Sequence, residues 1–97
     1  MQDINTPATK DTLQSMFDEI IKRCLKNIKT KLRSQLPERD VVYFERIAKR
    51  IISGYRLNFI TTNLGKYTDQ IDRRMINKCR AKLYYICHHW FINDYVE

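Results

Sequence analysis

Apolar residues between positions 13 and 36 recur at steps of three and four, which is the period of an amphipathic α-helix. Thr9 or Thr12 is a suitable N-cap for this helix. Pro37 ends the pattern, because the residue before a proline is disfavoured in the α-helical region. The spacing predicts one helix from about Lys10 to Gln35, roughly 39 Å long. Its apolar stripe consists of Leu13, Met16, Phe17, Ile20, Ile21, Cys24, Leu25, Ile28, Leu32 and Leu36.

A second apolar face begins directly after this proline, and it comprises Val41, Phe44, Ile47, Ala48, Ile51, Ile52 and Tyr55. Gly54 interrupts the face, and an interior glycine weakens a helix without necessarily ending it. Leu57 and Ile60 lie off the earlier stripe. Either the helix kinks at Gly54, or a short fourth helix runs to about Asn63. Gly65 suits a left-handed turn beyond the end.

The third apolar face consists of Ile71, Met75, Ile76, Cys79, Leu83, Ile86, Cys87 and Trp90. Thr68 is the predicted N-cap of a third helix, with Asp69 and Asp72 near its positive end. The helix is expected to end near Phe91 or Asn93.

Two glycines and two prolines in 97 residues are too few for a turn-rich β protein. Short connections make successive helices antiparallel. We therefore predict one all-α domain over residues 1–97, an antiparallel bundle of three long helices with residues 1–8 frayed and residues 94–97 as a polar tail. Its shared core is expected to include Ile21, Leu25, Ile28, Phe44, Ile47, Ile51, Met75, Cys79, Leu83 and Ile86.

Three cysteines have neither the even count nor the spacing of a disulfide framework, which indicates an intracellular, reducing compartment, the nucleus or the cytoplasm. Cys79, Cys87, His88 and His89 do not have the short-range spacing of a zinc site, so we expect no metal and no cofactor. No dyad spacing and no glycine-rich phosphate loop occurs, which favours a non-enzymatic protein. No apolar run approaches the ~20 residues of a membrane span, so we expect no membrane contact.

The net charge is +7, and the basic residues fall in acid-free stretches. Residues 20–36 contain six bases, and residues 46–68 and 73–93 contain five each. The helix dipole accounts for the order of the signs but not for the excess of bases. The excess indicates a surface that binds nucleic acid, DNA or RNA, through phosphates. The candidate binding residues are Lys22, Lys26, Lys29, Arg33, Arg46, Lys49, Arg50, Arg73, Arg74, Lys78 and Arg80.

Four cations of the first helix are spaced i, i+4, i+7 and i+11, which predicts one solvent-facing line. They are Lys22, Lys26, Lys29 and Arg33. On the third helix, Arg73 and Arg80 lie close to Tyr84 and Phe91. Because the first and third helices run parallel in such a bundle, their solvent faces can share a groove.

Aromatic residues are concentrated in the last third of the chain, and they are Tyr84, Tyr85, Trp90 and Phe91. Large side chains with polar tips suit interfaces, so this segment is a candidate contact for a protein partner or for a second copy of the chain. Two functions follow from these features. The first is nucleic-acid binding without strong sequence preference, alone or within a nucleoprotein complex. The alternative is a helical adaptor that docks on a larger protein complex.

Overall fold

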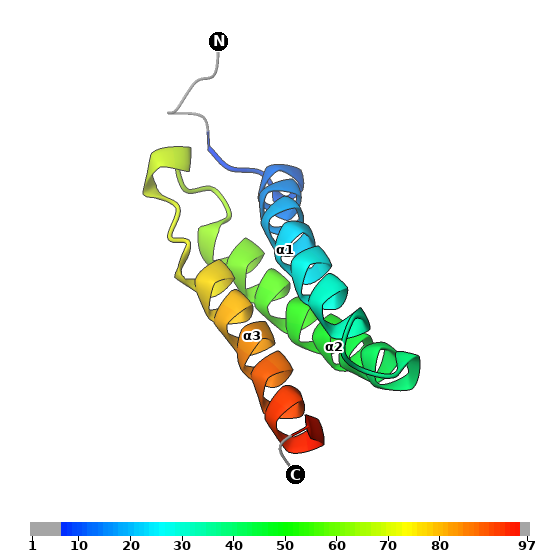
Figure 1. The fold of residues 1–97 in the computed structure, drawn as a ribbon. Coiled ribbons are helices and arrows are strands. Elements are labelled where there is room, and N and C mark those ends of the chain that lie inside the picture. The colour runs from blue at the N-terminus through cyan, green and yellow to red at the C-terminus, as the bar shows by residue number, and fades with distance from the viewer. Residues whose placement is uncertain (1–6, 96–97) are drawn as a thin grey trace.

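The computed structural model describes residues 7–95, and the side chains of residues 7–89. It contains three α-helices, and the prediction of an all-α bundle is confirmed (Figure 1). The helices are α1 (Lys10–Arg33), α2 (Glu38–Asn63) and α3 (Arg74–Tyr95), with a 3-10 turn at Thr68–Gln70. Apart from one isolated bridge, the described part of the chain has no β-structure.

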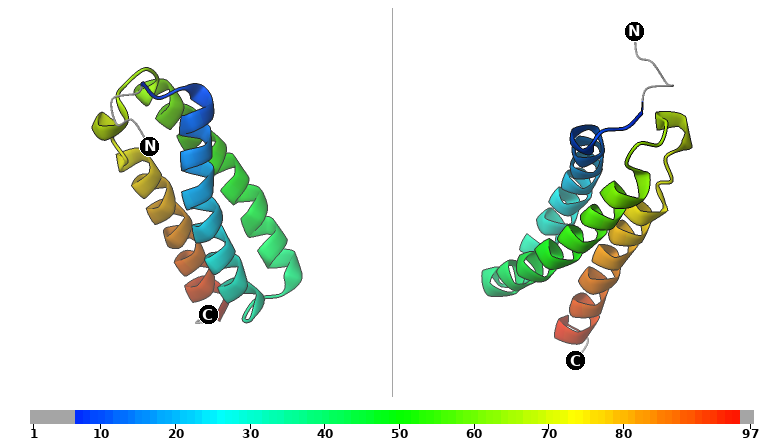
Figure 2. Two further views of the ribbon diagram at one scale, coloured as in Figure 1. Left: turned by 90° about the horizontal axis from the view of Figure 1, so that it is seen from above. Right: turned by 180° about the vertical axis from the view of Figure 1, so that it is seen from behind.

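Each helix packs against the other two, and α2 runs antiparallel to α1 and α3 (Figure 1). Viewed from above, α1 lies over the seam between α2 and α3, which also pack against each other (Figure 2). The molecule is elongated, with dimensions of 52 × 23 × 17 Å. As a result, α1 forms one seam with α2 and another with α3, and its remaining surface faces solvent.

The start of α1 is where the sequence predicts it. The hydroxyl of Thr9 accepts a hydrogen bond from the Thr12 N–H at 3.2 Å and caps the helix. The helix ends at Arg33, slightly before the predicted Gln35, and α2 begins directly after Pro37. Proline therefore separates the two helices as its restricted backbone requires.

Gly54 lies inside α2, which continues as one helix to Asn63. No fourth α-helix follows Gly54 in the described residues, so that alternative is wrong. Phe59, four residues after Tyr55, continues the apolar face of α2 into the core, and Ile60 beside it is also buried. Gly65 adopts the predicted left-handed conformation, with φ of 82°.

The N-cap of the third helix is not Thr68, because α3 begins at Arg74. The carboxylate of Asp72 accepts hydrogen bonds from the Arg74 N–H at 2.9 Å and from Arg74 Nε at 2.7 Å, and these bonds lower the pKa of Asp72. The Asp72 N–H donates to Oδ1 of buried Asn63 at 3.3 Å. Asn63 also donates to the carbonyl of Phe59 at 2.9 Å. These contacts hold the connection against the end of α2 and delay the start of α3.

Ala8 is fixed, contrary to the predicted fraying of residues 1–8. Its N–H donates to the Lys66 carbonyl at 2.8 Å, its carbonyl accepts from the Gly65 N–H at 3.0 Å, and its side chain is buried. Residues 1–6 lie outside the described residues.

The polar tail is shorter than predicted, because α3 continues to Tyr95 instead of ending near Phe91 or Asn93. Asp94 and Tyr95, the first two residues of the predicted tail, are therefore part of α3. Residues 96 and 97 lie outside the described residues.

The core runs along the whole bundle. Five of the predicted core residues are buried, namely Ile21, Ile28, Phe44, Cys79 and Leu83. The other five are only half-buried, and four of these pack against the core, namely Leu25, Ile51, Met75 and Ile86. The fifth is Ile47. The expected core lacked Phe59, whose ring lies 5.7 Å from that of Phe17.

Alanine substitutions at the two glycines are expected to have opposite effects. Gly54→Ala should stabilise the fold by ~1 kcal/mol, because an interior glycine costs about that much relative to alanine in a helix. Gly65→Ala should destabilise it by ~1 kcal/mol, because its backbone is left-handed. An added Cβ meets no atom within 4 Å at either position, so backbone conformation alone distinguishes the pair. Urea unfolding of both variants measures the difference, and destabilisation by Gly54→Ala would contradict a continuous α2.

Candidate functional site

Two ion pairs join α1 to α2 along their seam. Lys29 Nζ lies 2.6 Å from Glu45 Oε2, and Arg56 Nη2 lies 2.7 Å from Asp18 Oδ2. The step from Lys29 back to Asp18 on α1 equals the step from Glu45 forward to Arg56 on α2. Two antiparallel helices that keep the same register along their contact are expected to show equal steps in opposite directions, as these two ion pairs do. Both carboxylates at this seam are therefore already paired.

The predicted line of cations on α1 lies beside this seam. Lys22, Lys26 and Arg33 are exposed, but the Lys29 side chain is only 20% exposed because it reaches across to Glu45. The prediction that the whole line faces solvent is therefore wrong at Lys29. The four cations surround a shallow recess of about 320 Å³ on the surface of α1, together with Leu25 and Thr30.

Lys49 brings further positive charge from α2 to the same face, next to Glu45. The hydrogen bond from Lys29 lowers the pKa of Glu45, burial opposes the shift, and the charges of Lys29, Lys49 and Arg33 lower the pKa further. Glu45 is therefore ionised at neutral pH, and Lys29 is its ion-pair partner. Lys49 lies close enough to influence Glu45 but is exposed and forms no ion pair among the described residues.

Other predicted binding residues lie away from this face. Arg46 is exposed on α2. Arg50 lines a recess of about 310 Å³ between α2 and α3, which Lys82 also lines. The structure thus separates Arg50 from the cations of α1 and joins it to a lysine outside the predicted set.

The predicted cations in and directly before α3 point to different sides of that helix. Arg73, Arg74 and Lys78 are exposed, and Arg74 is bound to Asp72. Arg80 lies at the seam between α3 and α1. Among the predicted cations of α3, Arg80 is thus placed opposite α1.

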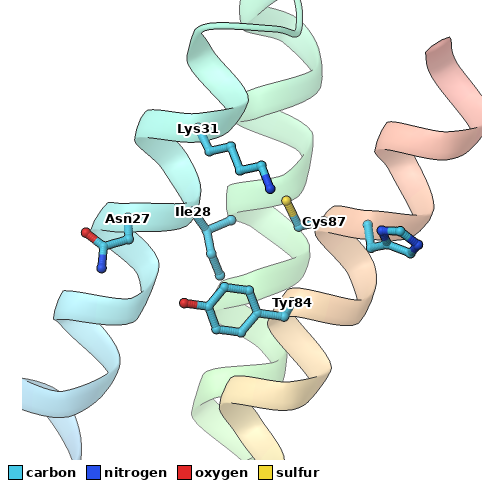
Figure 3. A pocket seen from close by; sticks show the side chains of 6 residues that line it. Asn27, Ile28, Lys31, Tyr84 and Cys87 are labelled. Carbon is cyan, nitrogen blue, oxygen red and sulfur yellow. The ribbon is translucent and has the colours of Figure 1, made fainter.

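A groove runs along the seam between α1 and α3. Its larger part, about 530 Å³, is lined by Asn27, Ile28, Lys31, Tyr84, Cys87 and His88 (Figure 3). An adjoining part of about 250 Å³ is lined by Ile20, Arg23, Cys24, Asn27, Arg80 and Tyr84. Asn27 and Tyr84 line both parts, so the two parts of the groove adjoin at these side chains.

The floor of the groove is apolar, since Cys24, Ile28 and Cys87 are buried. The Tyr84 side chain extends from α3 toward α1, and the Lys31 side chain reaches from α1 toward Cys87 (Figure 3). Side-chain hydrogen bonding with Cys24 raises the pKa of Tyr84. Burial raises the pKa of Cys87, and the charge of Lys31 opposes that shift.

The α1 wall of this groove was not among the predicted binding residues. Arg23, Asn27 and Lys31 are spaced four residues apart and border the apolar stripe. The predicted line of Lys22, Lys26, Lys29 and Arg33 lies far from the apolar stripe, so a prediction based on that line does not include cations at the edge of the stripe. Their spacing within the acid-free stretch 20–36 is the signal that identifies them, once α3 is known to lie alongside.

Two of the four predicted interface aromatics have described side chains. Tyr84 is 48% exposed and Tyr85 is 64% exposed. The Tyr85 ring stacks on His89 at 6.2 Å between centroids, and Lys82 Nζ lies 5.8 Å from its centre. The side chains of Trp90 and Phe91 lie outside the described residues.

The three cysteines, Cys24, Cys79 and Cys87, are buried and free, and burial raises the pKa of Cys79 to about 11. Within the described part of the chain, no group of three or more His, Cys, Asp or Glu is placed to hold a metal ion. No helix in that part is both long and apolar enough to cross a membrane. Comparison of the chain with protein-family models, curated proteins and solved structures finds no match.

Proposed function

We propose that this protein binds nucleic acid through phosphate contacts, without catalysis, and that α1 provides the main contact surface. One observation carries this proposal. Four of the six cations in the acid-free stretch of α1 are exposed and form no ion pair within the described residues. They are Lys22, Lys26, Lys31 and Arg33.

The helix dipole explains only part of this pattern. Lys31 and Arg33 lie in the last turn of α1, where the negative end of the dipole favours cations. Lys22 and Lys26 lie in the middle of the helix, where the dipole contributes little. Their charge has no neutralising partner in the described structure, and a polyanion would supply one.

The geometry also suits an extended polyanion better than a single phosphate. Lys22 and Arg33 are separated by ~16 Å along the helix axis. Exposed Lys49 extends the same face onto α2. Contacts spread over such a strip neutralise several phosphates, and each neutralised phosphate releases condensed counterions. No base-reading motif accompanies the strip, so binding is expected to be largely independent of sequence.

The dependence of affinity on salt tests the proposal. Phosphate contacts by Lys22, Lys26, Arg33 and Lys49 on this strip predict a slope of about −3.6 for the logarithm of the duplex binding constant against that of the salt concentration. Affinity for a labelled mixed-sequence duplex should then fall about 100-fold between ~50 and ~200 mM salt. Absence of binding at low salt, or binding that salt does not weaken, would rule the proposal out.

An adaptor role is the second candidate, and exposed apolar side chains support it. Tyr84 and Tyr85 are exposed on α3, and Leu57 and Leu64 are exposed on or just beyond the last part of α2. Such side chains suit a protein partner or a second copy of the chain. Binding through them would be nearly insensitive to salt, which separates this candidate from the first in the same titration.

A further inference from the structure

The two walls of the α1–α3 groove carry matching rows of side chains. On α1 the row is Arg23, Asn27 and Lys31, and on α3 it is Arg80, Tyr84 and His88. Both rows advance by four residues in the same direction, because the two helices run parallel (Figure 1). An arginine therefore stands on each wall at one end of the groove, and a lysine faces a histidine at the other end.

No carboxylate lies on the facing stretches of these walls. Residues 20–36 and 73–93 contain no acid. The nearest acid along α1 is Glu19, which already pairs with Arg23 at 3.0 Å on the exposed rim. The groove is thus positively charged at its rims over an apolar floor, a combination that fits a ligand with an anionic backbone and flat, weakly polar side groups.

Tyr84 provides a stacking surface in the middle of the groove. Its ring projects from α3 toward α1 beside Ile28 (Figure 3). About half of Tyr84 is exposed, so one face of the ring is open to a ligand. The larger part of the groove, about 530 Å³, falls within the roughly 300–1,000 Å³ of small-molecule pockets.

We infer that the α1–α3 groove binds unpaired bases of single-stranded nucleic acid, with a base stacked on Tyr84 and the flanking phosphates at the cations of both walls. This inference rests on the proposed function and names its preferred substrate class. Proteins that bind single strands combine a cationic groove with aromatic rings, since every base has a face that stacks. In a duplex those faces are covered by neighbouring base pairs, and extruding a base costs a few kcal/mol.

Fluorescence anisotropy with four matched probes of about 12 nucleotides tests the inference. The probes are single-stranded DNA, single-stranded RNA, the corresponding duplex, and an abasic strand that has phosphates but no bases. Tyr84→Ala is expected to weaken binding of the single strands about 5- to 100-fold, the range for losing one stacked base. Binding of the duplex and of the abasic strand should change less than about 2-fold, because these probes offer no free base face.

Tyr84→Phe keeps the ring and should retain single-strand binding. Tyr85→Ala is the matched control, since Tyr85 is the adjacent tyrosine but does not line the groove. Circular dichroism verifies that each variant is folded. Lys31→Glu, at an exposed position, is a second groove variant, and it should weaken single-strand binding more than duplex binding.

The outcomes distinguish failure of nucleic-acid binding as such from failure of base binding in the α1–α3 groove. If the parent protein binds none of the probes at low salt, the proposed function fails, and the inference fails with it. If the parent binds every probe and Tyr84→Ala weakens all of them equally or none, the groove does not hold bases, while the phosphate surface stands. A loss from Tyr85→Ala as large as that from Tyr84→Ala would likewise overturn the groove assignment.

Discussion

Replacing Phe17 with alanine is expected to destabilise the protein by about 3–5 kcal/mol, the usual cost of truncating a fully buried phenylalanine. Phe17 is 0% exposed and packs its ring 5.7 Å from that of Phe59, joining α1 to α2. The substitution would leave a cavity between the first part of α1 and the last part of α2, so both helices would lose contacts at once. In a domain of this size the change should lower the Tm by at least ~12 °C, measured by circular dichroism.

Leu57→Ala is the matched control on α2. Leu57 is two residues from Phe59 but 63% exposed, so its truncation should change the free energy of unfolding by no more than about 0.5 kcal/mol. Leu25→Ala should have an intermediate effect, because Leu25 is only half-buried. A Tm for Phe17→Ala equal to that of the parent would contradict the packing of α1 on α2.

Reversing two charges on α1, Lys22→Glu with Lys26→Glu, is expected to lower affinity for duplex and single-stranded nucleic acid alike by 10-fold or more. Both lysines are exposed and form no ion pair within the described residues, so the fold should be unaffected. Two lost phosphate contacts should also reduce the salt slope by about two. Lys29 is left unchanged, because Lys29→Glu would place a second carboxylate against Glu45.

Arg73→Glu with Arg80→Glu is the corresponding double reversal at α3, with Arg73 directly before the first residue of that helix. Because Arg80 lines the groove, this variant should weaken single-strand binding more than duplex binding. If it abolished duplex binding while the α1 variant bound normally, the main phosphate surface would lie on α3. Binding of both variants at the level of the parent would refute phosphate contacts by either helix and favour the adaptor role.

Helix existence was predictable wherever local signals agreed. The stripe of α1, the cap at Thr9 and the break at Pro37 all act within a few residues, and all are found in the structure. The start of α3 was not predictable in this way. Thr68 has the chemistry of a cap, but buried Asn63 binds the Asp72 N–H and Asp72 in turn holds the first turn at Arg74. The choice between Thr68 and Asp72 as the start of the helix thus depends on Asn63 at the end of α2, and the sequence pattern around Thr68 does not contain that contact.

For the surface residues, too, some features follow from the sequence and others depend on how the helices pack. The sequence by itself determined that three long helices form, how far the acid-free stretches extend, and that Lys22 and Lys26 project away from the apolar stripe. Only the tertiary structure decided that Lys29 is paired with Glu45 across the α1–α2 seam, and that Arg23 and Lys31 share a groove with Tyr84. Periodicity describes one helix at a time, whereas the register between helices depends on how three apolar stripes pack together.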